Sequence, residues 1–236
     1  MTKDKVTVLM SAYNSQNTVS NALESLVNQT YKNIEILVVD DGSEDETLKI
    51  CLEYAKNFKN ISVHENKKNI GLTKSLNLLI DLSNGNLLAR QDADDISDLR
   101  RIEKQVDFLN KNNLDAVTSR ANIINQDRVI PRFSYYLPKK IVMRYKNPFI
   151  HGSLLIKKTS IQKLGGYNDK FYYSQDYKLM WDLIKTGGKI TIMKEPLYSL
   201  NMEENISTLM KEKQQYYASF VKKGKNPSIL SDNLNI

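Results

Sequence analysis

The sequence of 236 residues predicts an α/β fold, in which a doubly wound mixed sheet is flanked by helices. Three observations support this prediction. Apolar runs of strand length alternate with amphipathic helical segments over residues 6–97, and two of these runs end in clusters of aspartates. The chain is also long enough for one α/β domain with a complete core.

Strand and helix alternate in the first part of the chain. The expected strands are short and apolar, and they cover residues 6–12, 34–39, 61–64 and a run that starts at 87–89. The expected helices carry apolar residues at 3.6 spacing and cover residues 19–27, 48–55 and 72–82. Right-handed crossovers place the carboxyl ends of the strands at one edge of the sheet, where ligands bind. Both aspartate clusters are therefore expected to face one crevice.

The second half of the sequence is less regular. We expect helices over residues 99–109 and 175–185, and strands over 116–124, 149–156 and 190–193. Residues 125–147 hold several aromatic side chains and are interrupted by prolines, so no regular element is assigned to them.

The chain is basic, with 34 Lys and Arg against 27 Asp and Glu and a formal net charge of +7. This excess fits anionic partners such as nucleotides, phosphorylated lipids or a membrane surface, and it equally fits a lysine-rich solvated surface. Nucleic acid is not expected as a partner, because the carboxylates are concentrated in tight clusters.

Cysteine use and hydropathy indicate the compartment. Cys51 is the one cysteine, so no intrachain disulfide or zinc knuckle can form, which fits a reducing cytoplasm. No segment approaches the roughly 18–20 apolar residues of a membrane span. We therefore expect a cytoplasmic protein, with any membrane contact peripheral and at the inner face.

The segment Asp92-Ala93-Asp94-Asp95 places closely spaced carboxylates after a strand. Such an oxygen-rich group suits Mg²⁺ or Mn²⁺ shared with substrate phosphates. The alternative is a polar loop in which Asp95 or Ser97 caps the next helix.

The segment Asp40-Asp41-Gly42-Ser43 is a second acidic turn after a strand. Its carboxylates can accept hydrogen bonds from a nucleobase or ribose. Alternatively, Ser43 or Asp45 caps the following helix. The glycine-rich phosphate loops of dinucleotide-binding proteins and P-loop NTPases are absent from the sequence, as is a Ser-His-Asp hydrolase motif.

The chain resembles a family 2 glycosyltransferase with the GT-A fold, a family that inverts the anomeric centre. The resemblance covers roughly residues 5–200 and depends on six blocks that occur in the family's order. They are Val6 to Asn14, Ser25 to Tyr31, Val38 to Ser43, Asn69 to Asn77, the Asp-x-Asp segment Asp92 to Asp95, and Gly165-Gly166-Tyr167 followed by Gln175-Asp176. Gln-x-x-Arg-Trp of the processive synthases is absent, so transfer of a single sugar fits better.

The resemblance implies roles for the blocks that bind the donor, which is most readily a UDP-sugar. Tyr13 would lie against the nucleobase, Asp41 would accept its imide hydrogen, and Asp40 would support that loop. Asp92 would face the ribose, and Asp94 would bind the divalent metal, with Asp95 nearby. Ser11, where the family commonly has proline, and Lys74 complete the expected nucleotide site.

Asp176 matches the catalytic base of the family, which removes the proton of the acceptor hydroxyl. It opens an amphipathic helix, where the helix dipole favours an ionised acid. The family often has Glu where this chain has Gln175, which removes a charge beside the base. His151 is expected to contact the metal, the diphosphate or the acceptor, or to be a loop histidine with satisfied hydrogen bonds.

The resemblance also implies a domain organisation and partners. A catalytic domain would cover residues 1–202, with a nucleotide-binding half (1–97) and an acceptor half (98–202). The acceptor would be a glycan or a lipid-linked saccharide in polysaccharide biosynthesis. Residues 203–236 form a basic tail that, as a helix, could lie on an anionic membrane or pack on the domain.

Two other functions compete with this one. A nucleotidyltransferase should carry a glycine-rich basic loop early in the chain, and residues 10–21 contain no glycine. A non-catalytic nucleotide-sugar or carbohydrate-binding protein would keep the residues that bind the nucleobase. It would lose the acids that bind the metal or act as the catalytic base. Asp94 and Asp176 are both present.

Overall fold

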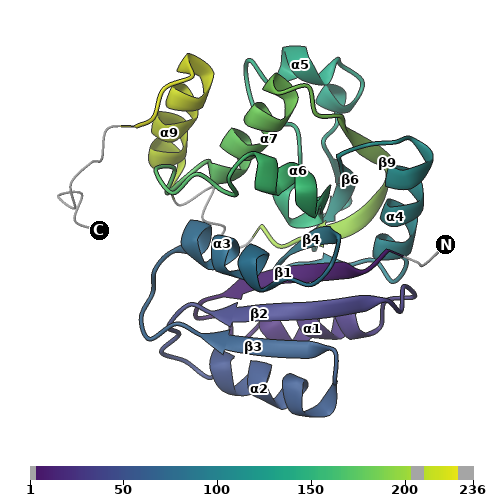
Figure 1. Cartoon of the computed structure of the whole chain (residues 1–236), viewed down its shortest axis with the longest axis vertical. Helices are drawn as coiled ribbons and strands as arrows, with labels where there is room; N and C mark the ends of the chain where they lie inside the picture. The colour runs from purple at the N-terminus through teal and green to yellow at the C-terminus, as the bar shows by residue number, and fades with distance from the viewer. Residues whose placement is uncertain (1–3, 203–209, 228–236) are drawn as a thin grey trace.

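A computed structural model describes residues 4–202 and 210–227 of the chain. Within these residues one mixed sheet of nine strands forms the centre, in the order β3-β2-β1-β4-β8-β6-β9-β5 with β7 beside β6 (Figure 1). The strands are β1 (Val6–Ala12), β2 (Ile34–Asp40), β3 (Ile61–Glu65), β4 (Leu87–Asp92), β5 (Ile96–Ser97), β6 (Ala116–Ile123), β7 (Val129–Ile130), β8 (Leu155–Lys157) and β9 (Ile190–Leu200).

Helices cover both faces of this sheet. They are α1 (Val19–Val27), α2 (Thr47–Asn57), α3 (Leu72–Leu82), α4 (Arg101–Lys111), α5 (Lys139–Val142), α6 (Lys158–Lys163), α7 (Gln175–Lys185) and α9 (Lys211–Lys223), with 3-10 turns η1 (Phe133–Tyr135) and η2 (His151–Ser153). Apolar residues of α1, α2 and α4 pack in one core cluster, and those of α3, α6 and α7 pack in another. The predicted α/β fold class is therefore confirmed.

The four strands of the first part are parallel, as the crossover argument predicts. β1 lies between β2 and β4, and β2 also pairs with β3. Ser11 is in register with Asp92 of β4 and with Val39 of β2, and Ala12 is in register with Asp40. The carboxyl ends of three strands therefore meet at one edge of the sheet.

The second part departs from the expected elements in several places. Elements β7, η1 and α5 lie in residues 125–147 and helix α6 follows β8, where no regular element was expected. Residues 149–154 do not form a strand. The turn η2 covers 151–153 of them, and only Leu155–Lys157 pairs, antiparallel to β4 and to β6. Gly152 lies in this turn because its backbone packs directly against Asp92 and Tyr198, where a strand residue with a side chain would clash. β9 continues well beyond residue 193 and pairs with β5. One sheet therefore contains strands from both sides of residue 97, the predicted boundary between the two halves.

The tail forms a helix where it is described. α9 packs on α7 through the buried side chain of Val221, with Tyr217 and Phe220 against the same core cluster. Its apolar face is therefore covered by the domain. The rest of the predicted tail, residues 203–209 and 228–236, lies outside the described residues. No helix in the described ranges is long and apolar enough to cross a membrane. The division into two halves at residue 97 stays a prediction.

Candidate active site

Asp41 is held by the chain that precedes α3. Its side chain is buried, and Oδ1 accepts hydrogen bonds from the Ile70 backbone N–H at 3.0 Å and the Asn66 amide at 2.8 Å. Oδ2 accepts the Gly71 N–H at 2.9 Å. Gly42 makes this packing possible, because its φ is +74° and a Cβ there would lie 2.6 Å from Asn69 N. The acidic turn and the loop over residues 66–71 thus form one unit.

Asp40 is buried beside this unit, with one carboxylate oxygen satisfied. Oδ2 accepts the Ser43 N–H at 3.0 Å. Oδ1 is buried and has no hydrogen-bond partner among the described residues. Tyr13, at the end of β1, is 45% exposed above the same edge. The exposed ring of Tyr13 offers a surface on which a planar ligand can stack.

The aspartates after β4 are crowded. Burial and the charge of Asp92 raise the pKa of Asp94 to about 6. Burial and the charges of Asp92 and Asp94 raise the pKa of Asp95 to about 8, although the Asn201 N–H donates to Asp95 Oδ1 at 2.8 Å. Burial is the largest cause in both cases, so this loop holds carboxyl groups where their charged forms are unfavourable. No group of three or more His, Cys, Asp or Glu side chains with metal-binding geometry occurs among the described residues.

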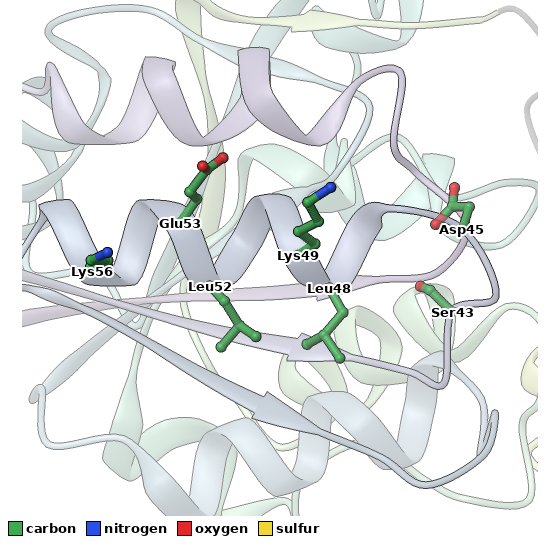
Figure 2. A pocket seen from close by; sticks show the side chains of 7 residues that line it. All are labelled: Ser43, Asp45, Leu48, Lys49, Leu52, Glu53 and Lys56. Atoms are coloured by element: carbon green, nitrogen blue, oxygen red, sulfur yellow. The ribbon is translucent and has the colours of Figure 1, made fainter.

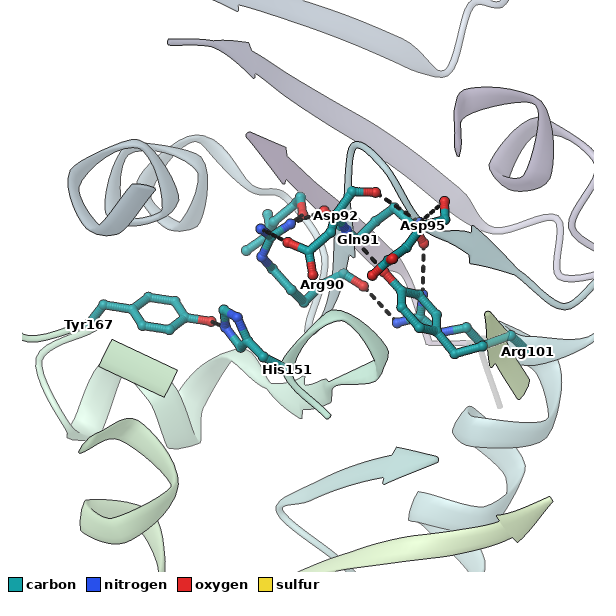
Figure 3. Close-up of polar contacts among 9 residues, drawn as sticks. Arg90, Gln91, Asp92, Asp95, Arg101, His151 and Tyr167 are labelled. Atoms are coloured by element: carbon teal, nitrogen blue, oxygen red, sulfur yellow. Dashed lines mark hydrogen bonds and ion pairs between the residues drawn. The ribbon is translucent and has the colours of Figure 1, made fainter. Parts of the chain in front are cut away.

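Two buried arginines that we did not predict lie beneath these aspartates (Figure 3). Arg90 forms an ion pair with Asp92. Arg101 is fully buried and donates to Gln91 Oε1 at 3.0 Å and to the Arg90 carbonyl at 2.7 Å. Burial lowers the pKa of Arg101 to about 10. Arg101 also donates from Nε to Gln105 Oε1 at 3.1 Å, one turn later on α4.

Tyr198 of β9 joins Arg101 to the acidic loop. Its ring lies 4.9 Å from the Arg101 guanidinium carbon, and its hydroxyl accepts the Asp92 N–H at 3.1 Å. Gly152 packs against Tyr198 and Asp92, and a Cβ on it would lie 2.6 Å from Asp92 Oδ2. Strand β9 and turn η2 therefore fix the position of Asp92.

His151 lies in turn η2, next to Gly152. Its Nε2 is 2.7 Å from the Tyr167 hydroxyl (Figure 3), and the rings meet edge to face. Burial and the charge of Arg90 lower the pKa of His151, and the charges of Asp176 and Asp92 oppose this. His151 is thus near both the end of β4 and the start of α7. Tyr167 is placed by Asn77, which accepts its N–H and donates to its carbonyl, each at 2.8 Å.

Asp176 lies in the first turn of α7. Its Oδ2 accepts a hydrogen bond from the Asn147 amide at 2.7 Å, and the oxygen of that amide accepts the Phe149 N–H at 3.1 Å. Asn147 was not predicted, because it lies in a segment without periodicity. Gln175 is buried beside Asp176, and Lys74 is exposed in the first turn of α3.

A shallow hollow runs along α2 (Figure 2). Ser43 and Asp45 line one end of it, and Lys49, Glu53 and Lys56 line the rest along the helix. Neither Asp40 nor Asp41 lines it, and its charges are mixed. We assign it no role in the site.

The fold places Tyr13, Asp40 and Asp92 at the carboxyl ends of parallel strands, the edge at which open α/β sheets bind their ligands. The family model described as "Glycosyl transferase family 2" matches residues 7–176. The chain therefore belongs to family 2 of the glycosyltransferases and is a glycosyltransferase. The resemblance stated from the sequence blocks is confirmed.

Curated relatives agree with this assignment. The putative glycosyltransferase EpsE of Bacillus subtilis is 31% identical over 210 residues, which cover 85% of this chain and 74% of EpsE. An Escherichia coli protein, the UDP-Glc:alpha-D-GlcNAc-diphosphoundecaprenol beta-1,3-glucosyltransferase WfgD, is 29% identical over 182 residues, which cover 76% of this chain and 70% of WfgD.

Solved structures show the same GT-A fold. TarS 1-349 of S. aureus in complex with UDP superposes with a TM-score of 0.75 at 17% identity over 92% of this chain, and this chain spans 64% of it. The mannosyltransferase PcManGT of Pyrobaculum calidifontis, in complex with GDP-Man and Mn²⁺, superposes with a TM-score of 0.74 at 19% identity. That match covers 95% of this chain and 66% of PcManGT.

Proposed function

We propose that this enzyme is an inverting glycosyltransferase that moves one sugar from a nucleotide diphosphate to an acceptor hydroxyl. One observation carries the proposal. The short segment 147–152 contacts both acids: the Asn147 amide donates to Asp176 Oδ2 at 2.7 Å, and a Cβ on Gly152 would lie 2.6 Å from Asp92 Oδ2. A group of acids suited to a diphosphate and a separate acid suited to a proton transfer therefore face one small region.

The nucleotide would bind at the ends of β1 and β2. Asp40 would support this loop through the hydrogen bond that it accepts from the Ser43 N–H, and the exposed ring of Tyr13 can cover a base. Asp41 already accepts three hydrogen bonds, so it keeps room for one more, from the imide of a base, at Oδ2. Ser11 and Lys74 would approach the ribose or the phosphates. UDP is the favoured nucleotide, because TarS is solved with UDP and the name of WfgD states UDP-Glc.

A divalent metal fits the acidic loop. Burial and the neighbouring acids disfavour the charged forms of Asp94 and Asp95, and a bound cation would favour them. One or two protein carboxylates are also the usual number where substrate phosphates supply further ligands to Mg²⁺. We assign the metal to Asp94 and Asp95, with Asp92 turned to the ribose. Bound Mg²⁺ or Mn²⁺ would stabilise the charge of the leaving diphosphate.

Asp176 is the proposed general base. Its carboxylate takes the proton of the acceptor hydroxyl while that oxygen bonds to the anomeric carbon and the bond to the diphosphate breaks. Attack from the face opposite the leaving group inverts the configuration. Asn147 holds the carboxylate through Oδ2 at 2.7 Å and leaves Oδ1 for the acceptor. His151 and Gln175 would orient the diphosphate or the acceptor.

The acceptor is proposed to be a glycan or a lipid-linked saccharide in polysaccharide assembly. This follows from the named acceptor of WfgD, a GlcNAc-diphosphoundecaprenol, and from the family. A reaction of this kind takes place in the cytoplasm, where nucleotide sugars are available.

Calorimetric titration with UDP, GDP and dTDP, each with Mn²⁺ and with EDTA, tests the donor site. We expect one nucleotide to bind only with metal. Asp94→Ala should weaken this binding, whereas Asp81→Ala, on the exposed face of α3, should leave it unchanged. Failure of all three nucleotides to bind, or equal binding by both variants, would contradict the proposal.

A further inference from the structure

The most exposed large apolar side chains of the described residues lie in one short segment. Phe133 is 83% exposed, Tyr145 is 74% exposed and Tyr136 is 73% exposed, and Leu137 and Ile141 lie between them with about half of their surface exposed. Clustering of such side chains on a surface marks an interaction site, since single exposed apolar residues are normally scattered.

The same segment is strongly basic. Residues 128–146 contain no Asp or Glu and six Lys or Arg, namely Arg128, Arg132, Lys139, Lys140, Arg144 and Lys146. The formal charge of the segment is thus +6, against +7 for the whole chain, so the net positive charge of the protein is concentrated here. Five of the six are exposed; Lys139 is the half-buried one.

Basic and aromatic residues meet in a hollow at the start of this segment. Arg120, Arg128 and Arg132 line it together with Phe133 and Tyr136, and Asp127 and Val129 complete it. Figure 1 shows α5, which follows these residues, at the end of the molecule farthest from β3 and α2. Three guanidinium groups around one hollow suit a phosphate group.

The segment is held rigidly from within. The ring of Tyr135 lies between the Arg120 guanidinium, at 5.5 Å, and the Lys139 amino group, at 5.2 Å. Lys139 also donates to the carbonyls of Ser134 and Leu137, at 3.2 and 3.1 Å. The exposed rings are therefore presented on a preformed platform.

We propose that residues 128–146 form the surface through which this protein docks on an anionic lipid bilayer. Phe133, Tyr136 and Tyr145 enter the interfacial layer, where aromatic rings are favoured. The arginines and lysines between them contact lipid phosphates, and the hollow holds one headgroup. This surface, rather than α9, carries the docking, because the apolar face of α9 is packed on α7. The inference is independent of the identity of the donor.

A single-stranded nucleic acid also prefers basic surfaces with aromatic rings. The aliphatic Leu137 and Ile141 favour the bilayer, since they provide no face on which bases stack and do gain from contact with acyl chains. Binding to an oligonucleotide is therefore treated as a competing outcome of the test.

Vesicle flotation of the full chain measures the docking. We expect binding to phosphatidylcholine vesicles that contain 30% phosphatidylglycerol, weak binding to pure phosphatidylcholine, and release at high salt. Arg128→Gln/Arg132→Gln/Arg144→Gln should weaken binding about 100-fold, because each basic residue near such a surface contributes several-fold. Lys56→Gln/Lys59→Gln/Lys111→Gln removes the same charge from other exposed positions and should change binding little.

A fluorophore placed on the surface locates the contact. Cys51 is buried, and burial raises the pKa of its thiol to about 12, so a cysteine introduced elsewhere can be labelled selectively. An environment-sensitive dye on Phe133→Cys should shift to the blue on anionic vesicles, and the same dye on Phe58→Cys, at the end of α2, should not.

Several outcomes would overturn the proposal. They are no flotation of the unmodified chain, equal loss in the two triple variants, a blue shift at residue 58 alone, or displacement from vesicles by a single-stranded oligonucleotide that binds the same arginines more tightly. Nucleotide titration of the Arg128→Gln/Arg132→Gln/Arg144→Gln variant should match the unmodified chain, which separates this test from that of the donor site.

Discussion

The side-chain amide of Asn147 donates a hydrogen bond of 2.7 Å to Asp176 Oδ2. The orientation of this amide is fixed, because its oxygen accepts the Phe149 N–H at 3.1 Å. Asp176 therefore has one oxygen engaged and a defined direction for the other. This contact ties the segment after α5 to the first turn of α7, and it connects the irregular part of the chain directly to the proposed base.

Asn147→Leu removes this hydrogen bond without adding charge. We expect kcat to fall by about 10- to 100-fold, since a misplaced base loses much of its effect, while KM for the donor stays within about twofold. Steady-state kinetics of nucleotide release checks this split. A rise in donor KM with an unchanged kcat would show that Asn147 acts on donor binding instead.

Asp176→Asn keeps the shape of the side chain and removes its ability to accept a proton. Turnover should fall by at least about 10²–10⁴-fold, the usual contribution of a general base. Calorimetry should show nucleotide binding close to that of the unmodified enzyme. Asp182→Asn, later on the same helix and paired with Lys178, is the matched control. Near-normal turnover of the Asp176 variant would make the base assignment wrong.

Asp94→Asn should stabilise the metal-free protein above pH 6. The folded protein holds the pKa of Asp94 at about 6, above the ordinary 3.8, so the ionised carboxylate is less favourable in the folded state than in the unfolded one. This penalty is absent below pH 4, grows as the pH rises from 4 to 6, and is complete above 6. We expect the variant to melt roughly 2–6 °C higher in EDTA at pH 7.5, a difference of about 1–2 kcal/mol.

Thermal melts from pH 4 to 8 test this sign. The difference between variant and unmodified protein should vanish near pH 4, and Mn²⁺ with nucleotide should reverse it. A variant that is less stable at pH 7.5 in EDTA would show that Asp94 is already neutralised within the protein.

Gly152→Ala should disturb the acidic loop. The added Cβ would lie 2.6 Å from Asp92 Oδ2 and would also clash with the Tyr198 hydroxyl, so Asp92 or strand β9 must shift. We expect metal-dependent nucleotide affinity to fall by about 10-fold or more, because small displacements of binding groups are costly. Gly224→Ala, at the C-cap of α9, serves as the control for a glycine substitution, because a Cβ there meets open space and its φ of +63° adds backbone strain away from the acidic loop. Unchanged affinity in both would contradict the proposed place of Asp92 at the nucleotide.

The first part of the fold could be predicted because its signals are local. The apolar run of β1 and the 3.6 periodicity of α3 give the observed bounds without adjustment. The strand expected over 149–156 failed for a reason that is not local. Gly152 must lie against Asp92 and Tyr198, which are far away in the sequence.

The predicted site residues were easier to find than the groups that hold them. Aspartates after strands stand out in the sequence, whereas Arg101 looks like an ordinary charged residue at the start of an amphipathic helix. Only the fold shows that it is fully buried beneath the acidic loop. Asn147 had no signal, because its partner Asp176 is 29 residues away.

The three hydrogen bonds to the Asp41 carboxylate limit how the sequence of the loop over residues 66–71 can vary. Two of its three hydrogen bonds come from peptide N–H groups, those of Ile70 and Gly71, which every non-proline residue supplies. Exchange of the side chain at position 70 should therefore be tolerated, but a residue inserted or deleted between 66 and 71 would move both donors at once. Variants of this loop, natural or engineered, should therefore differ in the side chain at position 70 and keep the length of the loop.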